Sequence, residues 1–467
     1  MSKSQKNEAL ILGLSFLITG GILAGSGCLL FNLPFCPAPP PPPPGDNINI
    51  SSGEEILFSQ SLSDTEEAGA EAFSNQNYQL AVEQFEAALD NNKNDPETLI
   101  YLNNAQIGDQ KAYQIAVAVP VSQISTAALE ILRGVAQAQT EINQAGGING
   151  VALKVWIADD QNNPEMAKKV AETLSENPDI LGVIGHFASP VTLAAAPVYN
   201  QNQLVMISAT STSTQISNAG DFIFRTVPSD RFTADKLTQY FLERLGLSKA
   251  AIIYNQQSQY SRSLKDELIT AIYGEGGEVV DTFDVSSTDF NPFKYYDSLI
   301  DQQAEAIILV PDSDKVEKTL QITRINEANL PILAGDSVYK PDTLNIGEAV
   351  EGMVVAVPWH IENNRSSEFV QTANQLWGGD VNWRSAMAYD ATQTLISAIA
   401  LRGGSRIATS PSRDGVAQIL SESGFSTPGA TGSIRFLRSG DRNQAVELVT
   451  IQPGTRSGYG YDFVLLP

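Results

Sequence analysis

Two polar loops in the middle of the chain carry the side chains best suited to hold a small charged molecule. The first follows the apolar run 180–184 and contains Ser189-Pro190 at the start of a helical segment. Serine before proline is typical of a helix start, where free N–H groups and the helix dipole favour an anion. The second loop, 208–214, is rich in hydroxyls, which donate to an anion and accept from an ammonium group. Together the loops predict a site for a carboxylate or a zwitterion.

The sequence offers little for catalysis. It contains no P-loop, no Gly-x-Ser-x-Gly elbow, no His-Glu-x-x-His and no Gly-x-Gly-x-x-Gly motif between a strand and a helix. Its two histidines are His186, which we expect to support its loop, and His360, so carboxylate chemistry is the main catalytic alternative. A net charge of −24 argues against nucleic-acid binding. We therefore expect a binding protein with no cofactor and no metal, and not an enzyme.

The elements that position these loops alternate regularly from Tyr113 onward. Amphipathic segments such as Thr126–Gln144, which has apolar residues at helical spacing and stops at Gly146-Gly147, separate short apolar runs. Such alternation predicts parallel sheets with right-handed crossovers, and in such sheets ligands bind at the carboxyl ends of the strands. We predict strands at Tyr113–Val119, Leu153–Ala158, Ile180–Ile184, Leu204–Ile207, Ala250–Tyr254, Glu278–Phe283, Ala306–Val310 and Gly352–Val357.

Residues 1–36 have the pattern of a membrane segment. Residues 10–33 are mostly apolar, which as a helix is enough to cross a hydrocarbon layer of ~30 Å. Lys3 and Lys6 precede this run, so the positive-inside bias places the N-terminus in the cytoplasm and the rest of the chain outside. We favour an uncleaved signal anchor in the inner membrane; the alternatives are a lipoprotein that carries its lipid on Cys28 and a cleaved signal peptide.

A linker and a short helical module follow. Residues 37–63 begin with a proline run that predicts a stiff polyproline II spacer, and continue as a polar stretch expected to be flexible. Residues 64–110 resemble a single tetratricopeptide repeat with two helices and a turn at 75–77. One repeat cannot bury a continuous core, so we expect it to pack on the next domain or on another chain. A plain helical spacer is the alternative. The resemblance rests on the spacing of Gly69, Ala81, Phe85 and Ala88.

An ordered series of sequence blocks runs through the remaining chain, from about Tyr113 to the C-terminus. The blocks are AVAVPV (116–121), EINQAGGINGVALKVWIADDQNNP (141–164), VIGHFASPVTLAAAPVY (183–199), VMISATSTST (205–214), FRTVPSD (224–230), AAIIYNQQSQYSRSL (250–264) and ILAGD (332–336). Together they resemble the periplasmic leucine/isoleucine/valine-binding proteins of type I fold.

This resemblance implies a set of ligand-binding residues. In that family a serine at the helix start and a threonine in the following loop hold the ligand's α-carboxylate, and these match Ser189 and Thr212. Thr210 matches the position whose backbone carbonyl accepts from the α-ammonium group. The tyrosine of the second lobe matches Tyr260, and the acidic partner of the ammonium group matches Asp336, which is shorter than the family's frequent glutamate.

The sequence therefore predicts a two-lobed α/β clamp over residues 111–467, with two parallel sheets and three crossovers. Lobe one covers about 111–228 plus parts of 358–467, and lobe two covers about 229–357 plus part of the C-terminal third. The expected function is capture of a neutral amino acid or a related zwitterion by hinge closure, outside the inner membrane, for an ABC importer whose permease is the partner. The alternative is a membrane-tethered sensor or assembly module that uses the same clamp without transport.

Overall fold

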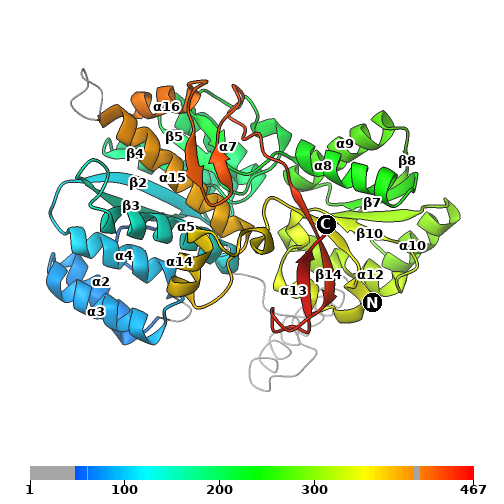
Figure 1. The fold of residues 1–467 in the computed structure, drawn as a ribbon, viewed down its shortest axis with the longest axis horizontal. Helices are drawn as coiled ribbons and strands as arrows, with labels where there is room; N and C mark the ends of the chain where they lie inside the picture. The colour runs from blue at the N-terminus through cyan, green and yellow to red at the C-terminus, as the bar shows by residue number, and fades with distance from the viewer. Residues whose placement is uncertain (1–47, 60–61, 404–410, 467) are drawn as a thin grey trace, which may run out of the picture. The chain divides into compact units, whose positions relative to one another are not determined.

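Two β-sheets organise the part of the chain that the structure describes (Figure 1). The computed structural model describes residues 48–59, 62–403 and 411–466. The chain divides into the units Met1–Gly45 and Asp46–Pro467, and all that follows concerns the second unit. The expected membrane anchor, the proline run and both cysteines lie outside the described residues. Among the described helices none is both long and apolar enough to cross a membrane.

The first sheet, with its helices, is called lobe one. Its strand order is β1-β3-β2-β4-β5-β6, with β1 antiparallel to β3 and the other neighbours parallel. Strands β4 and β5 are buried along their whole length, which explains why their sequences are unbroken apolar runs. The bounds are β1 Ile50–Ser51, β2 Ala112–Val119, β3 Ala152–Asp159, β4 Ile180–Ile184, β5 Val205–Ser208 and β6 Ile223–Arg225.

Helices cover both faces of this sheet. On one face α6 (Pro164–Glu176) and α7 (Ser189–Gln201) pack over β2 and β4. On the other face lie α5 (Ser125–Gln144), α14 (Glu368–Trp377), α15 (Trp383–Gly403) and α16 (Arg413–Ser421). Helices α5 and α15 approach so closely that a Cβ at Gly134 would lie 2.1 Å from the Ser385 carbonyl oxygen. A glycine is therefore required at this crossing.

The second sheet, with its helices, is called lobe two, and its strand order is β15-β14-β11-β10-β9-β7-β8. The neighbours from β8 to β11 are parallel, whereas β14 is antiparallel to both β11 and β15. The bounds are β7 Lys249–Tyr254, β8 Glu278–Asp284, β9 Ala306–Val310, β10 Ile332–Ala334, β11 Val354–Val357, β14 Glu447–Pro453 and β15 Tyr461–Leu465.

Lobe two is also covered on both faces. Helices α8 (Asp230–Gln239) and α9 (Gln259–Gly274) pack on the face that carries Ala250 and Ile252. The opposite face of β7, with Ala251 and Ile253, belongs to a core that includes residues from the helices α10 (Pro292–Asp301), α11 (Val316–Thr319), α12 (Gln321–Asn326) and α13 (Pro341–Leu344).

The described chain passes between the lobes three times. It leaves lobe one after β6 and begins α8 in lobe two, and it returns after β11, since α14 and α15 pack on α5. The hairpin of β12 (Thr427–Gly429) and β13 (Gly432–Ile434) lies beside α15 in lobe one. The third passage leads from this hairpin to β14 in lobe two.

The predicted two-lobed α/β architecture is confirmed, but the predicted purely parallel sheets are wrong at the edges. Strands β1, β14 and β15 are antiparallel. They do not belong to strand–helix–strand units: β14 and β15 form a hairpin, which needs only a short connection, and β1 comes from the segment before the helical module. The eight predicted strands are present with ends shifted by at most two residues. The described strands that were not predicted are β1, β6, β10, β12, β13, β14 and β15.

The helical module before lobe one contains three described helices where the sequence led us to expect two. Helix α2 (Asp64–Ser74) and helix α3 (Tyr78–Asn91) are separated by the expected turn, and α4 (Pro96–Ile107) follows. Phe85 is fully buried, and a Cβ at Gly69 would lie 2.6 Å from its ring, so the close packing of α2 on α3 depends on that glycine. Helix α4 then packs on α5 and β3, which joins the module to lobe one.

Residues 50–58, expected to be part of a flexible linker, are held in place. Ile50 and Ser51 form β1, and the Glu97 carboxylate accepts the N–H groups of Leu57 and Phe58 at 2.6 and 3.1 Å. The buried amide of Asn104 donates to the carbonyl oxygens of Ser52 and Val155, each at 2.7 Å, and accepts the Val155 N–H. These side chains lie in α4, so a sequence pattern confined to the linker could not have revealed them.

Candidate ligand-binding site

A cavity of about 230 Å³ lies between loops of the two lobes. Its walls are the loops that follow the carboxyl ends of β2 to β5 in lobe one and of β7, β9 and β10 in lobe two, together with the start of α15. This is where ligands bind in parallel sheets. The lining residues are Ile124, Asn162, Phe187, Ala188, Ser189, Pro190, Thr210, Gln257, Ser258, Tyr260, Asp312, Ser313, Asp314, Asp336, Ser337, Trp383 and Arg384.

The structure brings four of the five predicted residues to this cavity. Ser189 and Thr210 line it from lobe one, and Tyr260 and Asp336 line it from lobe two. Thr212 is absent from the lining, although it is only two residues beyond Thr210. The cavity therefore unites Ser189, which is predicted to bind the carboxylate, with Thr210 and Asp336, which are predicted to bind the ammonium group.

Ser189 lies at the start of α7, but not as its cap. The N-cap is Ala188, so Ser189 is the first helical residue, with Pro190 in the first turn. Its hydroxyl accepts the backbone N–H of Ser213 at 3.3 Å, which ties α7 to the hydroxyl-rich loop. Because Ser189 is 2% exposed, this hydroxyl is available only to a molecule inside the cavity.

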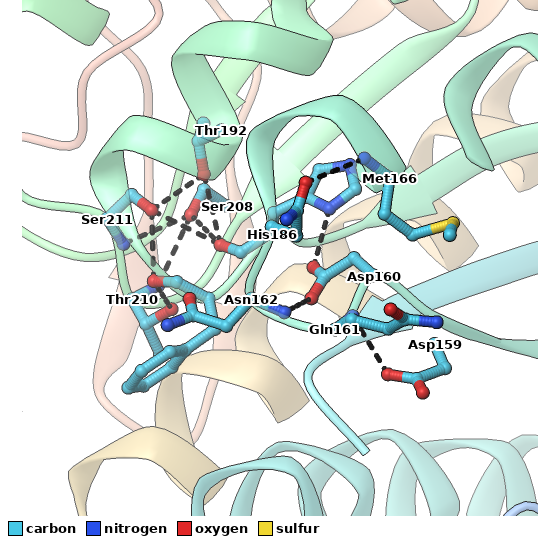
Figure 2. Close-up of polar contacts among 12 residues, drawn as sticks. Asp159, Asp160, Gln161, Asn162, Met166, His186, Thr192, Ser208, Thr210 and Ser211 are labelled. Atoms are coloured by element: carbon cyan, nitrogen blue, oxygen red, sulfur yellow. Dashed lines mark hydrogen bonds and ion pairs between the residues drawn. The ribbon is translucent and has the colours of Figure 1, made fainter. Parts of the chain in front are cut away.

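The hydroxyl-rich loop is bonded to the backbone beneath it (Figure 2). The hydroxyl of Thr210 donates to the Phe187 carbonyl at 2.8 Å, and Ser208 donates to the His186 carbonyl at 3.0 Å. Thr192 and Ser211, whose oxygens are 2.7 Å apart, also lie within 3.2 Å of the His186 carbonyl oxygen. The loop is therefore fixed before a ligand arrives, and the Thr210 hydroxyl retains lone pairs that can accept.

A buried hydrogen bond between His186 and Asp160 supports this network. His186 Nδ1 lies 2.7 Å from Asp160 Oδ2, both side chains are fully buried, and His186 Nε2 lies 3.2 Å from the Tyr199 hydroxyl. The second oxygen of Asp160 accepts the N–H of Asn162, a cavity residue (Figure 2). His186 itself does not line the cavity. It thus joins the loop after β3 to the loop after β4, as expected for a supporting residue.

Lobe two contributes a buried acid. Asp336 is 7% exposed, and the Tyr260 hydroxyl donates to its Oδ1 at 2.9 Å. Burial raises the pKa of Asp336, while the positive charge of Arg384 and the Tyr260 hydroxyl act in the opposite direction. Gly335 allows this geometry, because a Cβ there would lie 2.6 Å from the Tyr260 oxygen. A bound cation would favour the ionised form of this carboxyl.

Thr212 lies beside a second buried acid, Asp230, which the sequence analysis did not single out. The Asp230 N–H donates to the Thr212 carbonyl at 2.8 Å, and the Asp230 side chain is fully buried at the start of α8. Burial raises the pKa of Asp230 to about 7; the hydroxyls of Ser263 and Thr212 lower it, and the charge of Asp336 raises it further. Thr212 therefore contacts the connection between the lobes.

A pair of residues at the start of α15 also belongs to the site, although no sequence pattern predicted it. Trp383 and Arg384 line the cavity, with the guanidinium carbon 4.5 Å from the centre of the indole ring. Arg384 Nη1 lies 3.0 Å from Glu130 Oε2 of α5. The helix returns to lobe one from a distant part of the sequence, so no local pattern placed this pair beside Ser189. The Trp-Arg dipeptide before a long helical segment was the one available signal.

Comparisons with known proteins agree with this architecture. Residues 113–456 match the family model described as periplasmic binding protein. The chain is 34% identical over 135 residues to an amino acid binding protein of Pseudomonas aeruginosa, an alignment that covers 29% of this chain and 36% of that protein. It is 26% identical over 317 residues to the leucine-, isoleucine-, valine-, threonine-, and alanine-binding protein of the same organism, covering 66% of this chain and 81% of the relative.

The fold has solved counterparts as well. An ABC transporter substrate-binding protein from Desulfitobacterium hafniense is 26% identical, with a TM-score of 0.64, and the match covers 76% of this chain and all of that one. For the first curated relatives, the matched region spans only 36–41% of their length. The family match itself covers well over half of the chain and includes every strand of both sheets except β1 and β15. The chain belongs to the periplasmic binding protein family.

Proposed function

We propose that this protein captures an amino acid or a related small zwitterion by closing its two lobes on it, without catalysis. The observation that carries the proposal is the shared cavity, which has Ser189 and Thr210 on one side and Tyr260 and Asp336 on the other. The Ser189 hydroxyl at the start of α7 suits a carboxylate, and the Asp336 carboxylate suits an ammonium group. Both lobes are needed to contact both ends of such a ligand.

Closure accounts for tight binding in this scheme. A desolvated hydrogen bond to a charged group contributes about 1.5–3 kcal/mol, so four such bonds exceed the ordering cost of a small ligand and support micromolar capture. The connections near β6, near β11 and between β13 and β14 are the places where a hinge can act. Thr212 and Asp230, at the first of these connections, are proposed to position the lobes.

The proposed physiological role is delivery of the ligand to an ABC importer, outside the inner membrane. The names of the relatives support this role, since they include amino-acid-binding proteins and an ABC transporter substrate-binding protein. The apolar run 10–33 is proposed to tether the protein to that membrane. The partner in this role is the permease of the importer.

A second candidate role is ligand sensing or assembly without transport. The helices α2 to α4 favour it, because they pack on lobe one without lining the cavity and so leave their other surfaces for a partner. The proposed tetratricopeptide-like character of residues 64–110 fits such a role. Loss of amino-acid uptake when the protein is deleted would support transport, whereas normal uptake with a lost response would support sensing.

A thermal-shift screen of the full-length protein against the common amino acids tests capture itself. A ligand present at 100 times its dissociation constant adds about 2.7 kcal/mol to the free energy of unfolding. We expect at least one amino acid to raise the unfolding temperature, and its decarboxylated amine and deaminated acid to fail. If no amino acid stabilises the protein, the proposed function is wrong.

A further inference from the structure

Two N–H groups of residues that line the cavity have no hydrogen-bond partner among the described residues. They are Nε1 of Trp383 and Nε of Arg384. Both residues line the cavity, and they are 1% and 5% exposed, respectively. A buried donor without an acceptor is costly, so two adjacent ones on the same turn of a helix point to an acceptor that arrives from outside.

The start of α15 is held firmly, so these donors cannot turn to find partners elsewhere. Glu130 binds Arg384 through its carboxylate, and its carbonyl accepts the Ser385 hydroxyl at 2.7 Å. The Asn382 side chain accepts the Arg384 backbone N–H at 2.9 Å. The guanidinium also stacks on the Trp383 ring. The pair is therefore prearranged, as expected of residues that select a ligand.

Charge restricts the kind of acceptor. The cavity lining contains three carboxylates, Asp312, Asp314 and Asp336, against the single cation Arg384, and Arg384 is already paired with Glu130. If Asp336 binds the α-ammonium group, Asp312 and Asp314 remain to repel a second carboxylate on the ligand. They would instead accept hydrogen bonds from an N–H group.

We propose that the ligand is an amino acid whose side chain ends in a primary amide, of the glutamine or asparagine type. The amide oxygen accepts from Trp383 Nε1 and Arg384 Nε, and the amide NH₂ group donates toward the aspartates of lobe two. An aliphatic or a basic side chain leaves both donors without an acceptor. This inference rests on the proposed function and narrows its substrate class.

Matched ligands test the inference on the full-length protein. Calorimetry would compare asparagine with leucine, which has nearly the same shape, as well as glutamine with glutamate and with lysine. We expect the better of the two amides to bind at least about tenfold more tightly than leucine, glutamate or lysine, because each competitor leaves a buried group unpaired or adds a repelled charge. Tighter binding of leucine, glutamate or lysine overturns the inference but leaves amino-acid capture standing. Binding of no amino acid overturns both.

Variants of Trp383 and Arg384 test whether these two residues cause the preference for an amide side chain over leucine. Trp383→Phe keeps a ring and removes only the N–H group, and Arg384→Lys keeps the charge and removes Nε. Each is expected to weaken binding of the amide about five- to tenfold and to leave leucine affinity unchanged. Trp377→Phe is the control, because its indole nitrogen is also buried without a partner but Trp377 does not line the cavity. Equal losses for amide and leucine in the Trp383 and Arg384 variants, or a loss of amide binding in the control, would overturn the assignment.

Discussion

Lobe one reaches the cavity with hydroxyls that are already hydrogen-bonded to the backbone, whereas lobe two reaches it with carboxylates. Thr210 donates to the Phe187 carbonyl, and the buried pair of His186 and Asp160 supports the loop beneath. On the other side, Asp336 has the Tyr260 hydroxyl as its side-chain partner and a pKa raised by burial. The difference indicates that the two lobes contribute differently to binding. Lobe one supplies a loop that is fixed before the ligand arrives, and lobe two supplies a buried carboxylate that a bound cation would stabilise.

The largest expected effect on stability comes from removing the Asp160 side chain, which supports the cavity loop of lobe one. Asp160→Ala leaves His186 Nδ1 and the Asn162 N–H without their acceptor, and each buried polar group left unpaired costs about 1–3 kcal/mol of unfolding free energy, so the total loss should be about 2–6 kcal/mol. Urea denaturation measures this. Lys168→Ala is the matched control, because its pair with Glu165 has the same 2.7 Å separation but is exposed, and such pairs contribute about 0–1 kcal/mol. Similar losses of unfolding free energy in both variants would show that the cavity loop of lobe one does not depend on the contact between His186 and Asp160.

The acid between the lobes is expected to give the next effect, with a defined pH dependence. The unfolded chain loses the Asp230 proton near pH 4, whereas the folded protein keeps it up to about pH 7. Folded-state proton binding therefore exceeds that of the unfolded state in this window, and the free energy of unfolding falls as the pH rises from about 4 to 7.

Asp230→Asn removes this loss of stability. The free energy of unfolding of the variant should therefore exceed that of the wild type most at pH 8, by about 4 kcal/mol at most. Urea denaturation at pH 5 and pH 8 gives the difference between the two proteins. Asp235→Asn serves as the control, because its side chain on the same helix is 58% exposed. A difference that is constant with pH would contradict the raised pKa.

Removing the charge from lobe two is expected to affect binding more than stability. Asp336→Asn keeps an acceptor for the Tyr260 hydroxyl but loses the attraction for an ammonium group, which should weaken ligand binding by about ten- to a hundredfold. Because the variant also relieves the burial of a carboxylate, the ligand-free protein should be no less stable. Calorimetry and thermal unfolding separate the two effects. Unchanged affinity would remove Asp336 from the proposed ligand contacts.

The smallest effects should distinguish two hydroxyls of lobe one. Ser189→Ala removes a cavity hydroxyl and is expected to weaken binding about tenfold, whereas Thr212→Val, outside the lining, should change the affinity less than about threefold. The same calorimetric titration checks both. A larger loss in the Thr212 variant would mean that closure moves Thr212 into direct contact with the ligand.

The sequence predicted best what local pattern controls. The buried parallel strands are continuous apolar runs, and the loops after β4 and β5 contain the hydroxyls that line the cavity. Prediction failed where distant segments decide the outcome. The antiparallel β14 depends on a third passage between the lobes, and Arg384 reaches the cavity because α15 packs along α5. Asp230 was not predicted because the groups that act on its carboxyl, such as Thr212 and Ser263, come from both lobes rather than from its neighbours in the sequence.

The side-chain amide of Asn104 has a mechanical consequence. It donates both to the carbonyl oxygen of Ser52, in the segment before the helices, and to the carbonyl oxygen of Val155, in strand β3. Any pull applied upstream of residue 48 would therefore pass into the first sheet and not into the second. Lobe one would then stay fixed relative to such a tether, and lobe two would be the lobe that moves on closure.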